Sequence, residues 1–133
     1  MKFCKLSRLN TLIDDYFNVP QERTLMLDRA FIGLYSAFCF LKEETGRSKV
    51  LFTSNTCPSP VFACVYAGMT PVFADIYLDD YLMDEMDSIQ KIKDNKNDLA
   101  AVVYIYTYGH TSDNILSIQR YSQKYGIALI EDV

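Results

Sequence analysis

Apolar and polar positions along the chain change in blocks that predict helices and strands in turn. From Arg29 to Thr45 the apolar positions cover nearly the whole circumference, which predicts a buried helix capped by Asp28 and ended by Gly46. Three more helices are predicted: one at 61–67, one capped by Asp84 that runs to about Asn95, and one capped by Ser112 or Asp113 that ends at Gly126. Short apolar runs predict the strands between them, at about 49–54, 71–75, 100–106 and 127–131.

This alternation of helix and strand predicts the fold class. Consecutive helices and strands joined by short loops favour a parallel sheet with helices on both faces. We therefore expect an α/β fold with three layers, α/β/α, and a mostly parallel sheet. Residues 1–24 are poorly periodic and contain Pro20, which breaks regular structure, so they are predicted to form an N-terminal arm. Residues 25–133 are predicted to form the domain.

Polar residues follow each predicted strand. Parallel strands bring their carboxyl ends to one edge of the sheet, where ligands of open α/β folds bind. Ordinary loop polarity is the alternative explanation. At this edge two adjacent carboxylates stand directly before the last residue of the sequence, so we expect the chain to be the first part of an α/β ligand-binding domain. The residues in question are Asn55 and Thr56, Asp75, Tyr106 to His110, and Glu131 with Asp132.

Composition narrows the function classes. With 133 residues, of which 50% are hydrophobic and 23% charged, the chain is long and apolar enough for one globular domain. A net charge of −4 with scattered lysines and arginines disfavours a nucleic-acid partner. Four cysteines without a CxxC pair, and a single histidine, predict no metal site. Since neither a signal peptide nor an apolar run of membrane-spanning length is seen, we expect a cytoplasmic protein with no membrane partner.

Few side chains suggest chemistry by themselves. No GxGxxG or GxxxxGK motif is present, which disfavours the common nucleotide-binding loops. Arg29 could bind a phosphate at the start of the first helix, or equally pair with Asp28 or Glu22 on the surface. His110 is more simply an exposed loop residue than a catalytic one, and Cys57 lacks a neighbouring base that would activate its thiol.

Four segments in order resemble one enzyme family. They are Thr53–Ser59, Ala67–Asp75, Tyr106–His110 and Ile127–Asp132. Together they are similar to signatures of the DegT/DnrJ/StrS sugar aminotransferases, which are fold-type-I enzymes dependent on pyridoxal phosphate (PLP). The resemblance covers about residues 27–133. It implies that the predicted domain is part of the large, PLP-binding domain of such an enzyme.

The resemblance also implies roles for individual residues. Asp132 stands where the family aspartate keeps the pyridine nitrogen of the cofactor protonated, which makes the ring an electron sink. The turn that contains Arg29 and Ala30 stands where the family binds the cofactor phosphate. Cys57 stands where a residue, often aromatic, covers the cofactor ring. Tyr106 replaces a common histidine, and His110 a common glutamine.

The implied function is amino transfer from an amino donor to a keto-sugar nucleotide, a reaction of polysaccharide biosynthesis, in a homodimer. In the family, the lysine that forms a Schiff base with the cofactor lies after the Glu-Asp strand, and no lysine of this chain matches it. We therefore expect an N-terminal fragment that is inactive alone. A non-catalytic α/β pseudo-enzyme or interaction module is the alternative. A receiver-like signalling domain with Asp75 as phosphoacceptor ranks well behind both.

Overall fold

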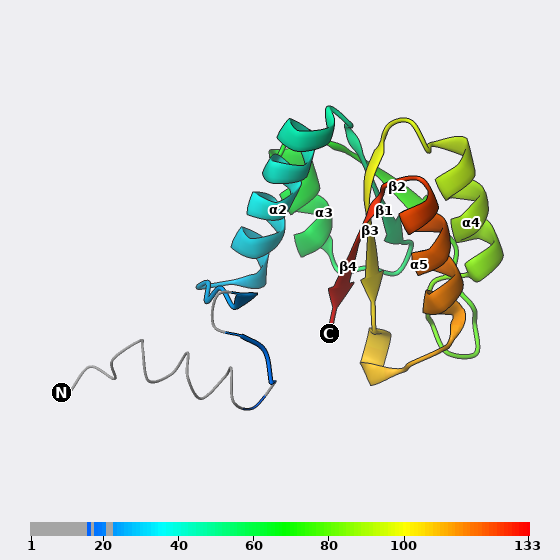
Figure 1. Ribbon diagram of the computed structural model, residues 1–133. Helices are drawn as coiled ribbons and strands as arrows, with labels where there is room; N and C mark the ends of the chain where they lie inside the picture. The colour runs from blue at the N-terminus through cyan, green and yellow to red at the C-terminus, as the bar shows by residue number, and fades with distance from the viewer. Residues whose placement is uncertain (1–15, 17, 21–22) are drawn as a thin grey trace. The chain divides into compact units, whose positions relative to one another are not determined.

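The computed structural model describes Tyr16, residues 18–20 and residues 23–133 (Figure 1). The chain divides into two compact units, residues 1–30 and residues 31–133, and each is described by itself. Most of the predicted arm, 1–24, lies outside the described residues, so the predicted domain boundary stays a prediction. In the N-terminal unit, the backbone N–H of Arg23 donates to the carbonyl of Pro20 at 2.8 Å, which forms a turn.

Helices and strands alternate through the second unit, as the hydrophobic pattern predicts. The four helices of this alternating series are α2 (Ala30–Thr45), α3 (Pro58–Tyr66), α4 (Glu85–Asp94) and α5 (Asn114–Lys124). The four strands are β1 (Lys49–Thr53), β2 (Thr70–Ala74), β3 (Leu99–Ile105) and β4 (Ala128–Asp132). A short 3₁₀ helix, η2 (Thr107–Gly109), follows β3.

The strands form one sheet in the order β2-β1-β3-β4, and every pair is parallel. Figure 1 shows α2 and α3 on one face of this sheet and α4 and α5 on the other. Since side chains alternate between faces along a strand, each face has its own core. Phe52 and Val103 pack on the α2/α3 face, whereas Leu51 and Val102 pack on the α4/α5 face. The expected three-layer α/β/α fold is confirmed.

Several element boundaries differ from the sequence prediction, and three of these differences change the description of the fold. Helix α3 begins at Pro58 instead of residue 61, because proline fits the first turn of a helix, where no intrahelical N–H bond is lost. Helix α2 begins at Ala30, so Asp28 does not directly precede it as a cap. The prediction that this helix is buried is wrong, because only Phe38 of its residues is buried, while Ile32 and Phe40 are exposed. Strand β4 continues to Asp132, beyond its predicted end at 131, and both Glu131 and Asp132 therefore belong to the strand.

Two structural features, a membrane-spanning helix and a group of metal-binding side chains, are not found in the described part of the chain. None of its helices combines the length and the apolar character needed to cross a membrane. Over the same residues, no group of three or more His, Cys, Asp or Glu side chains is arranged to hold a metal ion.

Candidate functional site

The parallel order brings the carboxyl ends of all four strands to one edge of the sheet. Hydrogen bonds join the segments that leave neighbouring strands. The N–H of Ser54, after β1, donates to the carbonyl of Ala74 at 2.9 Å, and the N–H of Tyr106, after β3, donates to the carbonyl of Asp132 at 3.0 Å. The polar residues that the sequence places after each strand thus share one edge.

The side-chain carboxylates of Glu131 and Asp132 lie on opposite faces of the sheet. Ala128 and Ile130 pack against the α2/α3 core, so Asp132, two residues further along β4, belongs to that face. Glu131 belongs to the α4/α5 face, where its Oε2 accepts a hydrogen bond from the Tyr106 hydroxyl at 2.5 Å. Asp132 is half-buried, and within the described residues its carboxylate has no hydrogen bond or ion pair. The structure therefore separates two side chains that are adjacent in sequence.

Cys57 lies on the same face of the sheet as Asp132. It is the N-cap residue of α3, the helix that packs on the α2/α3 face through Ala63 and Cys64. Its thiol is exposed and makes no side-chain cap hydrogen bond. Strand β3 separates β1 from β4, and strands in a sheet are about 4.8 Å apart, so the ends of β1 and β4 are roughly 10 Å apart. A flat ring could fit across that distance.

Arg29 and Ala30 belong to the N-terminal unit, and their role stays a prediction from the sequence. Ala30 is the first residue of α2, whose first turn contains no acidic side chain. The backbone N–H groups of such a turn have no partner within the helix and favour an anion. The local structure is therefore compatible with the predicted contact to a phosphate.

The side chain of Tyr106 links the carboxyl edge of the sheet to a series of buried polar groups on the α4/α5 face. Its ring lies 5.1 Å from that of Tyr104, centroid to centroid, in an edge-to-face arrangement. The buried Tyr104 hydroxyl donates to Oδ1 of Asn114 at 2.6 Å, and Nδ2 of Asn114 donates to the carbonyl of Met83 at 3.0 Å. The hydrogen bond to Glu131, with burial, raises the pKa of Tyr106 to about 12, and burial raises that of Tyr104 to about 12. Both phenols remain protonated donors at neutral pH.

A cavity of about 400 Å³ opens beside Tyr106. It is lined by Tyr106, by residues 111–113 of the loop before α5, and by Ile115. Tyr106 and α5 border it on the α4/α5 side, so it is not the space next to Asp132. The carboxyl edge therefore offers two distinct surfaces, one on each face of the sheet.

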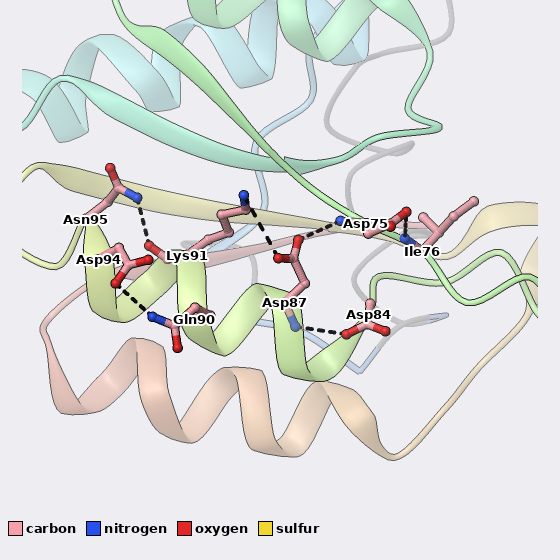
Figure 2. Close-up of polar contacts among 8 residues, drawn as sticks. All are labelled: Asp75, Ile76, Asp84, Asp87, Gln90, Lys91, Asp94 and Asn95. Atoms are coloured by element: carbon pink, nitrogen blue, oxygen red, sulfur yellow. Dashed lines mark hydrogen bonds and ion pairs between the residues drawn. The ribbon is translucent and has the colours of Figure 1, made fainter.

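Asp75 has a local structural role. Its Oδ1 accepts a hydrogen bond from the N–H of Ile76 at 2.8 Å, and its own N–H donates to Oδ2 of Asp87 at 2.9 Å. Figure 2 shows the same Asp87 between Asp75 and Lys91, whose Nζ lies 3.9 Å from Oδ1 of Asp87. These contacts fix the turn from β2 towards α4, and they give no support to a phosphoacceptor role for Asp75.

Sequence reasoning missed a contact among three loops at the same edge. Nδ2 of Asn55, after β1, donates to the carbonyl of Tyr81, after β2, at 3.0 Å. The ring of Tyr81 meets that of Tyr108, after β3, edge to face at 5.9 Å. Both tyrosines have positive φ, 60° and 57°, which is uncommon for residues with a side chain. No local sequence signal indicates this pairing. His110, by contrast, is exposed, and its ring makes no hydrogen bond within residues 23–133.

The profile of the DegT/DnrJ/EryC1/StrS aminotransferase family matches residues 33–133, which is most of the chain. The chain belongs to this family. The predicted resemblance is thereby confirmed, and the match includes the segments that carry Cys57, Tyr106 and Asp132. A search of curated proteins gave no match.

Solved structures share the fold. A protein from Bacillus cereus ATCC 10987 assigned as a PLP-dependent aminotransferase is 27% identical, with a TM-score of 0.76 over 94% of this chain and 33% of that one. The sugar aminotransferase CalS13 from Micromonospora echinospora is 18% identical, with a TM-score of 0.79 over 94% and 34%. DesI, solved in the presence of its TDP-sugar product, is 22% identical, with a TM-score of 0.59 over 75% and 25%. The chain thus spans about a third or less of the length of these proteins.

Proposed function

We propose that these 133 residues are the N-terminal, cofactor-binding part of a PLP-dependent nucleotide-sugar aminotransferase. The observation that carries the proposal is the position of Asp132. It ends β4 on the α2/α3 face, half-buried, and its carboxylate has no partner among the described residues. The family match over residues 33–133 and the fold shared with aminotransferases support the same conclusion.

The residues present fit the cofactor. When bound, PLP withdraws electrons from the carbon atom whose bonds change during amino transfer. The carboxylate of Asp132 would accept the N–H of the pyridine ring and so hold a proton at that nitrogen. The backbone N–H groups of the first turn of α2, which begins at Ala30, together with Arg29, would bind the phosphate. Cys57, exposed at the start of α3, would contact one face of the ring.

The remaining chemistry needs groups from outside these residues. No lysine of this chain matches the family lysine that bonds to the cofactor and transfers protons. We therefore infer that the 133-residue chain alone does not transfer amino groups, and that another segment or chain supplies the lysine. For the complete protein we propose a keto-sugar nucleotide as substrate, an amino donor and a homodimer.

The first prediction tests Asp132 by titrating the chain with PLP. A charge-assisted hydrogen bond contributes about 1.5–3 kcal/mol, so Asp132→Ala should weaken binding roughly 10- to 100-fold. Asp79→Ala is the matched control, because Asp79 is an exposed carboxylate without a hydrogen bond or ion pair within the described residues. Fluorescence of the bound cofactor gives the dissociation constants. Equal affinity of Asp132→Ala and the parent chain would contradict the role of Asp132.

A second measurement tests the expected inactivity. Borohydride reduction of the chain mixed with PLP, followed by peptide mass spectrometry, should find no single lysine modified stoichiometrically. Modification of one specific lysine together with turnover of a keto-sugar nucleotide would refute the inference. If the chain does not bind PLP at all, the alternative of a non-catalytic α/β interaction module is favoured.

A further inference from the structure

We propose that Tyr106 is the positioning residue of the two carboxylates at the end of β4. It holds Glu131 on the α4/α5 face, to which strand alternation directs this side chain, and thereby keeps Asp132 as the one carboxylate of the pair on the α2/α3 face. The first half of this inference concerns the chain itself. The second half, in which the arrangement prepares Asp132 for a pyridine nitrogen, rests on the proposed function.

Two hydrogen bonds from one residue carry the inference. The hydroxyl of Tyr106 donates to Oε2 of Glu131 at 2.5 Å, and its backbone N–H donates to the carbonyl of Asp132 at 3.0 Å. The first bond fixes the side chain of Glu131, and the second fixes the peptide group that follows Asp132. Tyr106 therefore sets both the direction of Glu131 and the position of the Asp132 backbone.

The end of β4 needs such support. Strand β4 lies at the edge of the described sheet and pairs only with β3, in a register that ends at Ile105 and Asp132. Terminal residues of an edge strand have few neighbours and open easily. Without its partner, the Glu131 carboxylate could turn around the strand end towards Asp132. Two carboxylates on one face repel each other, which would favour a different arrangement of both.

Tyr106 is itself held in place. Its ring packs edge to face on the buried ring of Tyr104, which is anchored by Asn114. Asn114, the first residue of α5, is anchored in turn by the carbonyl of Met83. A chain of fixed groups thus runs from the segment before α4 to the end of β4. The raised pKa of Tyr106, about 12, means that its hydroxyl donates throughout the physiological range.

The first arm of the test uses the chain without any ligand. Tyr106→Phe, Glu131→Ala and the double variant are compared by urea unfolding. If the two side chains act as one unit, the urea concentration at the midpoint of unfolding falls no further in the double variant than in the more destabilised single variant. Tyr121→Phe is the control, because it makes the same chemical change where no hydroxyl hydrogen bond is present among the described residues. Additive losses would overturn the first half of the inference.

The second arm uses pyridoxine 5′-phosphate, whose ring nitrogen changes the ultraviolet spectrum when it is protonated. In Tyr106→Phe the dissociation constant should rise about fivefold or more, corresponding to at least about 1 kcal/mol. The bound nitrogen should also lose its proton at a lower pH, by about half a unit or more. Glu131→Gln keeps an acceptor for the hydroxyl, so its affinity should stay within about twofold of the parent chain.

The two arms separate the possible failures. If the unfolding data show coupling but Tyr106→Phe binds and protonates the ligand as the parent chain does, the positioning of Asp132 is overturned and only a structural bond remains. If the parent chain does not bind pyridoxine 5′-phosphate, the cofactor part of the proposed function fails, and the second half of this inference fails with it. The unfolding data still decide the first half in that case.

Discussion

At the scale of single residues, Asp98 connects two strands at the amino edge of the sheet. Its Oδ1 accepts from the N–H of Ser48 at 2.9 Å and from the Ser48 hydroxyl at 3.0 Å, and its Oδ2 lies 3.5 Å from Nζ of Lys49. The backbone hydrogen bond from Ser48 is the largest cause that lowers the pKa of Asp98, although partial burial opposes it. All three contacts favour the ionised carboxylate, because they disappear or weaken when it is protonated.

This lowered pKa predicts a pH dependence of stability. A carboxyl group whose folded-state pKa is depressed contributes stability above its unfolded pKa, about 3.9, and loses it as the pH falls through the folded value. From pH 7 to pH 2 the parent chain should therefore lose more stability than Asp98→Asn. The side chain is 43% exposed, so solvent screening should keep the difference below about 1 kcal/mol. Urea unfolding at several pH values measures it, and parallel profiles would contradict the assignment.

At the scale of elements, the start of α4 is capped as the sequence predicts. Asp84 has an extended conformation, with φ −63° and ψ 123°, and its Oδ1 accepts from the N–H of Asp87 at 2.8 Å. Acidic residues follow in the first turn and lysines lie in the last turn, which complements the helix dipole. Figure 2 shows this cap beside the contacts that tie Asp87 to Asp75 and Lys91. The same short segment thus starts the helix and fixes the loop after β2.

The cap gives a prediction at this scale. Asp84→Ala removes the acceptor for one of the first N–H groups of α4 and should lower the free energy of unfolding by about 1 kcal/mol. Asp84→Asn keeps a side-chain oxygen that can cap the helix and should retain most of the stability. Urea denaturation followed by circular dichroism distinguishes the two variants. Equal losses would indicate that the charge of Asp84, and not its hydrogen bond, stabilises the helix.

At the scale of the domain, Arg47 joins segments that are far apart in sequence. Its Nη1 donates to the carbonyls of Leu99 at 3.1 Å and Gly126 at 2.8 Å, and its Nη2 donates to the carbonyl of Tyr125 at 2.9 Å. One guanidinium from the α2–β1 connection therefore holds the start of β3 and the turn from α5 to β4. No local pattern in the sequence indicates this role for Arg47.

Replacing this guanidinium should destabilise the domain. Arg47→Lys keeps the charge but cannot reach three carbonyls with the planar fork of arginine, and hydrogen bonds to charged groups contribute about 1.5–3 kcal/mol each. We expect Arg47→Lys to lower the free energy of unfolding by about 2 kcal/mol. Arg120→Lys is the control, because Arg120 is exposed and makes no hydrogen bond or ion pair within the described residues. A loss no larger than that of the control would contradict the structural role.

The sequence by itself determined the elements and the class of fold. Apolar periodicity reports which faces of a helix or strand are buried, and this signal is local. It therefore located β1, β3 and the helix capped by Asp84 to within a few residues. The segment order also indicated the aminotransferase family, which the match over residues 33–133 confirms. Boundaries were less certain, as at Pro58, because a proline is compatible with both a loop and a first helical turn.

Only the tertiary structure decided how the candidate site is arranged. Strand order and register depend on contacts between residues far apart in sequence, which a local pattern does not contain. Because β4 extends to Asp132, strand alternation sends Glu131 and Asp132 to opposite faces, and pairing with β3 brings Tyr106 to both. The contact of Asn55 with Tyr81 and the three hydrogen bonds of Arg47 arise in the same way. They form when parallel strands bring their ends, and the loops attached to them, to common edges.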